Sequence, residues 1–426
     1  MFGKWKKKEE PAIWGRQESG AMDGARRRWR SMYMSSQGLR LPAAIAGELA
    51  RLTTLEMRVS VKGEGGEFLE KALGPLMGRL RRELEYAMAD GSMVLKPYYD
   101  GKNLKIDVVN GGSFKPVSWD GNGNITGAVF YQELKKEDGY YTRVERHGFE
   151  NGRYIIENSA YKSRVPGEGG KEIPLTEVDE WKDMAESVVL ENIDRPLFGF
   201  FRTPAANTVD PLSPLGVSVF SGAEDLILDA DRLYKNLLWE FESGKRRLYV
   251  DITAFDRDGK GQPKLPDTEL FRTIDVNDSG FFSEWSPELR NEALQSGLNT
   301  VLQRIEFNCG LAYGTISQPS YVEKTAEEIR ASKQRSYCFV CDLQRQLRTA
   351  LEELIYAMGV WAQVYALSKI GEYSCGFEFD DSIIADRKAE YEEKVRLVEL
   401  GVMRPWELRA WYLGESEQLA REALEA

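Results

Sequence analysis

Apolar residues spaced three and four positions apart predict helices in three segments between residues 42 and 243. The clearest pattern covers 223–243 and stops at Gly244, where basic residues follow, as suits the carboxyl end of a helix. The same spacing predicts helices over 42–57 and 67–89, and the second of these should be interrupted or bent near Gly74-Pro75. Each segment has the one-sided apolar face of an amphipathic helix.

Helical patterns continue in the second half. Ser286 and Pro287 have the residue types of an N-cap and a first helical position, and they predict a helix that ends at Gly310. A capping box begins at Thr325 and opens a pattern that could run to Leu367, about 43 residues or roughly 65 Å. Two helices are predicted in the tail, over 382–400 and 405–413.

Strand patterns fall in two blocks. Between 91 and 165, short runs of β-forming residues alternate with Asp-Gly and Asn-Gly turns at nearly regular spacing, which predicts a meander or a small sheet. Strands over 248–252 and 271–276 flank a tight turn at 256–261. The segment 166–215 is rich in Pro and Gly and should be mostly irregular. These blocks predict an α+β fold.

Composition narrows the class of protein. With 426 residues, 42% hydrophobic residues and a net charge of −11, the chain resembles a soluble globular protein, and its length suggests about three domains. Its one histidine, His147, excludes two-histidine acid/base pairs and is expected at the surface or in a turn. Four cysteines are too few for a disulfide scaffold, so a reducing compartment is expected. No signal peptide is recognised, and the longest apolar stretch, 354–367, is shorter than a membrane span.

Charge is distributed unevenly along the chain. Residues 1–40 carry a net charge of +6, and residues 372–426 carry −7. The basic segment is interpreted as a solvated arm that docks on a neighbour, with direct DNA contact as the alternative. The net acidity of the whole chain argues against tight general binding of nucleic acid.

A search for chemistry finds no active site. The chain has no Gly-Lys-Ser/Thr triplet of a P-loop and no Gly-x-Ser-x-Gly nucleophile elbow. Cys338 and Cys341 form a CxxC inside a predicted helix without a second pair, so two buried thiols of unassigned function are expected. No carboxylate pair stands out. The sequence therefore predicts no catalytic residue, no metal and no cofactor.

Three stretches carry a family resemblance. The first is 210–216, Asp-Pro-Leu-Ser-Pro-Leu-Gly, leading into the helix that ends at 244–247. The second is 308–329, from Asn-Cys-Gly-Leu to Glu-Lys-Thr-Ala-Glu-Glu-Ile, and the third joins 380–384 with 400–403 and 411–415. In this order they resemble portal proteins of tailed bacteriophages, especially those of phages of Gram-positive hosts. The resemblance runs from about residue 40 to the end.

The resemblance implies a division of the chain and a role. It implies a basic N-terminal arm outside the resemblance (1–40), an α/β wing (41–215), two stem helices (216–244 and 285–310) around a small clip (245–284), a tunnel loop (311–324), a long wing/crown helix (325–371) and a helical crown (372–426). Portal subunits form a ring, usually a dodecamer, at one capsid vertex. Double-stranded DNA passes through it during packaging and ejection.

The expected partners also follow from the resemblance. They are further copies of the chain, the terminase large subunit, a head–tail adaptor, and the major capsid and scaffolding proteins, without a membrane. The protein would be non-enzymatic and found in the virion, and in the host cytoplasm during assembly. Two alternatives stay open: another virion structural protein, such as a minor capsid component or an adaptor, and a carboxylate-dependent hydrolase.

The resemblance assigns candidate residues to four places. The DNA-facing tunnel loop would contain Gly314, Ser317, Gln318, Ser320 and Tyr321, with a solvated connector as the alternative. The acidic channel lining would contain Asp229, Asp231, Glu240, Glu288 and Glu292. The clip surface for terminase and adaptor would contain Asp256, Arg257, Asp258, Lys260 and Gln262, unless this is an ordinary hairpin turn. Subunit packing of the stem would use Leu226, Leu233, Leu237, Leu294, Leu298 and Leu302.

Overall fold

The computed structural model has an α+β fold built from two compact units. It describes residues 20–167, 170–262, 264–265, 270–276, 278, 280–318, 326–379, 387–413, 420–421 and 423–424. The sheet unit comprises Met1–Arg27, Ala46–Ser218 and Thr325–Ala426. The helix-pair unit comprises Arg28–Ile45 and Val219–Lys324.

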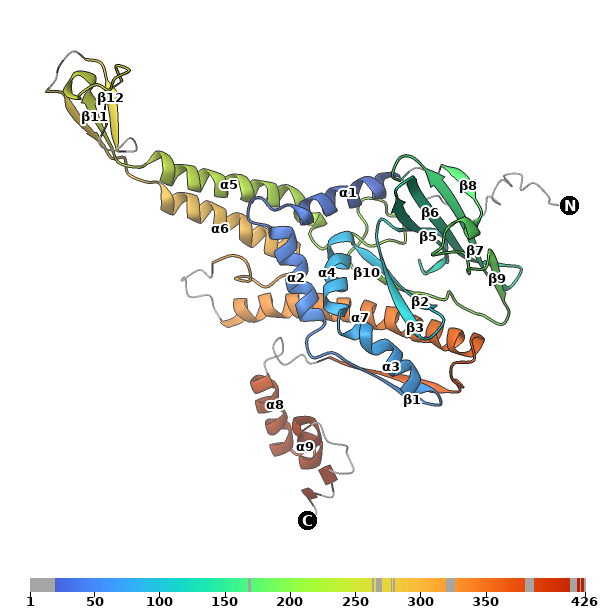
Figure 1. The fold of residues 1–426 in the computed structure, drawn as a ribbon. Coiled ribbons are helices and arrows are strands. Elements are labelled where there is room, and N and C mark those ends of the chain that lie inside the picture. Colours follow the sequence, from blue (N-terminus) through green and yellow to red (C-terminus); the bar gives the residue numbers. More distant parts are fainter. Residues whose placement is uncertain are drawn as a thin grey trace. The chain divides into compact units, whose positions relative to one another are not determined.

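The core of the sheet unit is the long helix α7 (Ala326–Val364), which packs against a three-stranded antiparallel sheet. The sheet has the order β10 (Gly199–Arg202), β2 (Ser92–Tyr99) and β3 (Leu104–Asn110), as Figure 1 shows. At Gly199 a Cβ atom would lie 2.0 Å from the carbonyl oxygen of Ala350, so only glycine allows this approach of strand and helix. The predicted long helix is confirmed, with 39 residues.

Two short helices and a two-stranded sheet complete this layer. Helices α3 (Gly66–Met77) and α4 (Leu80–Asp90) together cover the predicted helix. The predicted interruption lies at Gly78-Arg79, a few residues after Gly74-Pro75, and Pro75 itself lies inside α3. Strand β1 (Arg58–Gly63) pairs antiparallel with β14 (Tyr373–Glu378). The expectation that 372–426 is wholly helical is therefore wrong.

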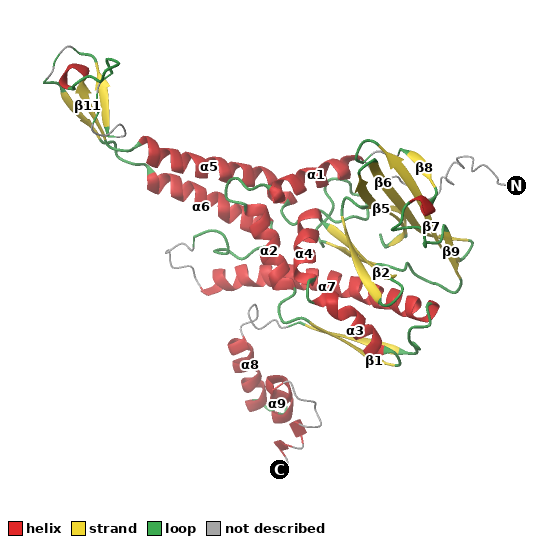
Figure 2. Cartoon of the chain, in the orientation of Figure 1, coloured by secondary structure: helices red, strands yellow, loops and turns green. Residues whose placement is uncertain are grey.

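The second sheet of this unit is antiparallel. Its order is β4 (Phe114–Trp119), β5 (Ile125–Lys136), β6 (Gly139–Glu150), β7 (Arg153–Ser163) and β8 (Lys171–Ile173), with β9 (Ser187–Leu190) also paired to β7 (Figure 2). The predicted turns are confirmed, but the predicted meander is divided between two sheets. A short 3₁₀ helix, Leu175–Glu177, follows β8.

Part of the predicted N-terminal arm is a folded helix. Helix α1 (Gly20–Met34) buries Met22 and Ala25 in the sheet unit, where Arg26 donates hydrogen bonds to Gly111 O at 2.6 Å and Ser92 Oγ at 3.0 Å. The interpretation of 1–40 as a solvated arm is therefore wrong from residue 20 onward, while 1–19 lie outside the described residues. Helix α2 (Leu41–Thr53) confirms the predicted helix there.

The helix-pair unit contains two long helices and a small sheet between them in sequence. A 3₁₀ turn (Ser221–Ala223) leads into α5 (Glu224–Ser243). After α5 come β11 (Arg247–Asp251), the 3₁₀ turn Ile252–Ala254, β12 (Phe271–Ile274) and β13 (Phe282–Trp285), in the sheet order β12-β11-β13. The chain returns along α6 (Asn291–Asn308), which packs against α5 (Figure 1).

The start of α6 differs from the prediction by five residues. Ser286 and Pro287 are not helical, and the helix begins at Asn291. The cause is a long-range contact, because the backbone N–H of Arg290 donates to Glu240 Oε1 at 3.1 Å and holds 286–290 along the end of α5. Leu289 packs directly against Gly244, since a Cβ atom on Gly244 would lie 2.2 Å from Leu289 Cδ2.

The tail of the described chain forms a helical hairpin. Helix α8 (Arg387–Glu399) packs against α9 (Pro405–Leu413), where the rings of Tyr391 and Tyr412 have centroids 5.2 Å apart. The predicted helix start at Ser382 lies outside the described residues, as does the capping box at Thr325. Within the described ranges, none of the helices combines the length and apolarity that crossing a membrane requires.

Candidate functional site: the helix pair and its loop

The helix pair is held together by apolar residues between α5 and α6. Leu237 and Leu298 are buried with Ile227 and Ile305. The other predicted stem leucines are half-buried: Leu226, Leu233, Leu294 and Leu302. Leu237 and Leu298 therefore hold one hairpin together and offer little surface to a second subunit, which differs from the predicted role in subunit packing.

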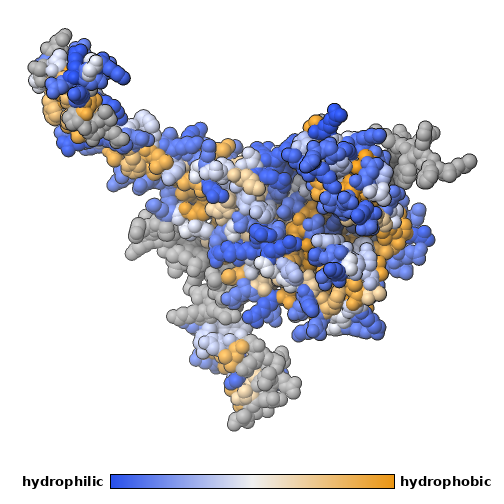
Figure 3. All heavy atoms as spheres, in the orientation of Figure 1, coloured by the Kyte–Doolittle hydropathy of each residue, from blue (hydrophilic) through white to orange (hydrophobic). Residues whose placement is uncertain are grey.

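Large apolar side chains instead lie on the outer face of α5. Leu228, Leu238 and Trp239 are 58%, 49% and 62% exposed. Leu228 and Trp239 are eleven residues apart, about three helical turns, so they share one face. Figure 3 shows apolar surface along the helix pair. Sequence reasoning missed these residues because it followed the buried stripe, although a tryptophan outside that stripe was a usable signal.

The predicted acidic lining does not form one surface. Asp229 and Asp231 are two positions apart on α5 and so point to nearly opposite sides of the helix. Asp231 Oδ1 accepts the backbone N–H of Leu39 at 2.7 Å, and Asp229 pairs with Arg232 at 2.7 Å. Glu288 is exposed in the segment before α6, and Glu292 is exposed in its first turn.

Glu240 is a structural residue of the hairpin. Its side chain is buried, and Oε2 accepts from the Arg290 guanidinium at 2.8 Å while Oε1 accepts from Nε and from the backbone N–H, both at 3.1 Å. The side-chain and backbone hydrogen bonds from Arg290 lower the pKa of Glu240 to about 2. A carboxylate used in this way joins the two helix ends, so its prediction as a channel-lining residue is wrong.

The loop after α6 is bound to the helix by a carboxylate. Glu306, fully buried on α6, accepts the backbone N–H groups of Ile316 at 2.7 Å, Ser317 at 2.9 Å and Gly314 at 3.2 Å. The Ser317 hydroxyl donates to Glu306 Oε2 at 2.8 Å. Ser317 is therefore buried against α6, and its prediction as a DNA-facing residue is wrong.

The other predicted loop residues have different positions. Gly314 adopts φ 88°, a conformation that favours glycine, and Gln318 has an exposed side chain. Ser320 and Tyr321 lie outside the described residues. Glu306 was not predicted, because a single carboxylate in an apolar pattern looks solvated until a loop folds over it.

The predicted clip turn is confirmed as a turn. Asp258 Oδ1 accepts the backbone N–H groups of Lys260 and Gln262, both at 2.8 Å. The side chains of Asp256, Arg257, Lys260 and Gln262 are exposed, while that of Asp258 is half-buried. Four of the five predicted clip residues thus offer their side chains to a partner, and the fifth shapes the turn.

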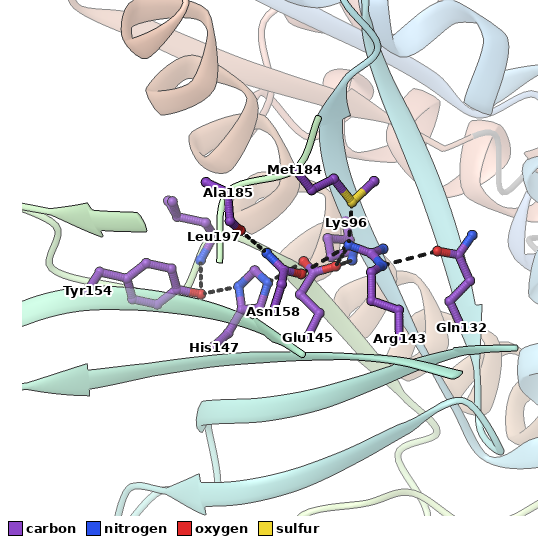
Figure 4. A network of polar contacts seen from close by, with 10 residues as sticks. All are labelled: Lys96, Gln132, Arg143, Glu145, His147, Tyr154, Asn158, Met184, Ala185 and Leu197. Atoms are coloured by element: carbon purple, nitrogen blue, oxygen red, sulfur yellow. Dashed lines mark hydrogen bonds and ion pairs between the residues drawn. The ribbon is translucent and has the colours of Figure 1, made fainter. Parts of the chain in front are cut away.

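A second polar cluster lies in the sheet unit, between β2 of one sheet and β6 and β7 of the other (Figure 4). Lys96 Nζ and Glu145 Oε2 form a buried ion pair at 2.6 Å, and Arg143 approaches the same oxygen at 3.0 Å. His147 Nε2 lies 2.6 Å from Glu145 Oε1, and His147 Nδ1 lies 2.8 Å from the Tyr154 hydroxyl. His147 is buried inside β6, so the expectation of a surface or turn histidine is wrong.

The contacts of this cluster fix the proton positions. The ionised Glu145 can only accept a hydrogen bond, while Tyr154 OH accepts the backbone N–H of Leu197 at 3.0 Å and is able to donate its own hydrogen to His147 Nδ1. His147 must then carry its hydrogen on Nε2 and donate to Glu145. Burial lowers the pKa of His147, which favours this neutral ring, while the nearby Glu145 acts in the opposite direction. Against the effect of burial, the charge of Lys96 and the hydrogen bond from His147 hold the pKa of Glu145 well below its usual value.

The neutral state of His147 predicts a pH dependence. Unfolding exposes the ring, which then takes up a proton near its ordinary pKa of 6.5, while the folded state binds none at that pH. The free energy of unfolding should therefore fall as the pH drops below about 6.5. Urea denaturation at pH 7.5, 6.5 and 5.5 measures it. His147→Gln should be less stable at pH 7.5 but less sensitive to this pH range, and equal sensitivity of both proteins would contradict a neutral buried His147.

The cysteines of the CxxC pair differ in exposure from the prediction. Cys338 is exposed and Cys341 is half-buried, so the expectation of two buried thiols is wrong. Within the residues described, no group of three or more His, Cys, Asp or Glu side chains is arranged to hold a metal ion.

Comparisons with known proteins give distant structural matches. No family model and no curated protein matches the chain. The chain is similar to a chain in the virion of a native gene transfer agent (GTA) particle, with 9% identity, 95% of both chains covered and a TM-score of 0.48. It is also similar to a chain in the neck of the native GTA particle computed with C12 symmetry, with 10% identity, 95% of both chains covered and a TM-score of 0.46. At these identities and TM-scores, the likeness does not establish a shared fold or function.

Proposed function

We propose that this chain is the subunit of a ring that forms a DNA channel at one vertex of a viral capsid, the role of a portal protein. The observation that carries the proposal is the α5–α6 hairpin, with a small sheet inserted between the helices and a loop bound along α6 after them. This is the order of stem, clip, stem and tunnel loop that the three resembling stretches imply.

The outer face of the hairpin supports self-association. A pair of helices buries only the faces that meet, and here Leu228, Leu238 and Trp239 face outward. Exposed apolar side chains that share a face mark an interaction surface. In a ring, each subunit uses one surface to contact one neighbour and a different surface to contact the other, and the repeated rotation closes the ring. We assign this face of α5 to the contact with the next copy, and the proposed ring is a dodecamer without catalytic activity.

The charges of the hairpin suit passage of DNA without tight binding. Asp229 and Arg232 form an exposed pair at 2.7 Å, and Glu292 is exposed on α6. Holding a duplex would require many lysine or arginine contacts to phosphates. A wall of mixed sign supplies few of them, which favours sliding of the duplex through the channel.

The remaining parts receive proposed partners. The clip presents Phe282 and Trp285, 61% and 39% exposed, and the exposed turn at Asp256–Gln262, and we assign it to the terminase large subunit and then to a head–tail adaptor. The sheet unit would be the wing, in contact with the major capsid and scaffolding proteins, and the α8–α9 hairpin would belong to the crown. The protein would reside at the portal vertex of the virion, after assembly in the host cytoplasm.

A threading experiment tests the proposed channel. Purified rings are mixed with a linear duplex, and a bulky protein is then attached to each of its two ends. The rings should retain this duplex even at a salt concentration that removes surface-bound DNA. The same duplex blocked before mixing should be lost, because it cannot enter the ring. Equal retention of the two duplexes, or retention of neither, would contradict passage of DNA through the ring.

A further inference from the structure

The loop after α6 is bound to one stripe of the helix at two levels. Glu306 accepts four hydrogen bonds from Gly314, Ile316 and Ser317. Seven residues earlier on α6, Asn299 Oδ1 accepts the backbone N–H of Gln318 at 2.7 Å, and Asn299 Nδ2 donates to Gln318 O at 3.3 Å. Seven residues make about two turns, so both side chains lie on one face of α6, roughly 10 Å apart along its axis.

The chemistry of Glu306 matches the loop in detail. Every group that its two oxygens contact is a donor, and the carboxylate is fully buried. Ser317 Oγ also accepts the Gly314 N–H at 3.2 Å, which closes the turn. Removing a buried acceptor leaves these donors without partners, which costs more than the loss of a solvated hydrogen bond. The conformation of 314–317 therefore depends on this one side chain, and Asn299 holds Gln318.

We propose that Glu306, with Asn299, is the positioning residue of the proposed tunnel loop, so that residues 311–318 and α6 move as one body. The inference rests on the proposed function where it names this segment a tunnel loop, whereas the contacts between the loop and α6 do not depend on that function. Displacing the loop from α6 would break six hydrogen bonds at once. The loop should therefore change its position in the proposed channel only when α6 also shifts. Gln318, the last described residue of the loop, is held by Asn299.

Peptide-resolved hydrogen exchange on the full-length protein tests the coupling. In the unmodified protein, the amides of Ile316, Ser317 and Gln318 should exchange slowly, as do those of α6. Glu306→Gln places an NH₂ group opposite N–H and O–H donors, so exchange in 314–318 should rise about tenfold or more. Ser317→Ala removes the two hydrogen bonds of the hydroxyl, one to Glu306 and one from Gly314, but keeps the carboxylate, so it should give a smaller increase and provides a milder variant that keeps the fold.

Controls separate positioning from general support of the helix. Glu292→Gln alters an exposed carboxylate on the same helix and should change no loop amide. Faster exchange along α6 in the Glu306 variant, with the loop unchanged, would assign Glu306 to helix stability and overturn the proposal. Fast exchange of the loop in the unmodified protein would also overturn it.

A functional readout distinguishes this inference from the proposed channel. If the rings thread DNA, Glu306→Gln rings should still form but retain the end-blocked duplex differently from unmodified rings. Unchanged retention would overturn the positioning role while leaving the channel intact. If unmodified rings fail to thread, the proposed function fails, and the exchange experiment still decides whether the loop is bound to α6.

Discussion

Glu145→Ala should lower the free energy of unfolding of the sheet unit by about 3–5 kcal/mol. The substitution leaves Lys96 buried beside the ring of Phe130 without a counter-ion, 4.8 Å from the ring centroid. It also removes the acceptor of the His147 Nε2 hydrogen, so two polar groups lose their partners at once. Chemical denaturation followed by circular dichroism measures the loss.

Two comparisons make this result specific. Glu180→Ala breaks an exposed pair with Lys136 and should change stability little. The double variant Lys96→Met, Glu145→Leu removes both charges of the buried pair and should recover the part of the loss that comes from the unpaired Lys96. His147 Nε2 still lacks its acceptor in this variant, so the recovery should be partial. If Glu145→Ala were as mild as Glu180→Ala, the cluster would not join the two sheets as described.

Trp239→Asp should abolish assembly without unfolding the subunit. The indole is 62% exposed on the outer face of α5, so the isolated chain loses little when it is replaced. In a ring, a buried tryptophan at the centre of each contact is worth roughly 2 kcal/mol or more, and a desolvated aspartate adds its own cost. Every contact of the ring carries this loss, so closed rings should disappear, as sedimentation or mass photometry would measure.

The matched variants separate a surface effect from a folding effect. Val189→Asp places the same charge at an exposed apolar position on β9 and should leave assembly intact. Leu298→Asp places it inside the hairpin and should reduce helix content as well as assembly. Normal rings from Trp239→Asp would show that α5 does not contact the next copy through this face.

Strongly periodic elements were predictable from the sequence because their signal is local. The stripes of α5 and α7 and the Asp-Gly and Asn-Gly turns gave the correct elements. The start of α6 was not predictable, since Ser286-Pro287 suits a turn as well as a helix start, and the contact between Glu240 and Arg290 decides between them. Strand β14 was missed because the strand it pairs with, β1, lies more than three hundred residues away.

The sequence predicted which segments form the candidate site, but it predicted the roles of the individual residues less well. The order of helix, insert, helix and loop followed from local patterns and a resemblance. Ser317 was predicted to face DNA and Glu240 to line the channel, but both side chains are buried. Each contacts a partner elsewhere in the chain, which a local pattern does not reveal. Glu306 and the outward face around Trp239 required the packing of α5 on α6, which a residue pattern on a single helix does not contain.

Cryo-electron microscopy of the purified full-length protein tests the central claim most directly. A ring subunit should appear as closed rings with a central channel, with the α5–α6 hairpins lining it and Trp239 in contact with the neighbouring copy. Trp239→Asp, examined alongside, should give separate subunits with the same fold. If the unmodified protein instead remained a folded monomer at every salt and protein concentration, also in the presence of capsid and scaffolding proteins, the account of this chain as a ring-forming channel subunit would be contradicted.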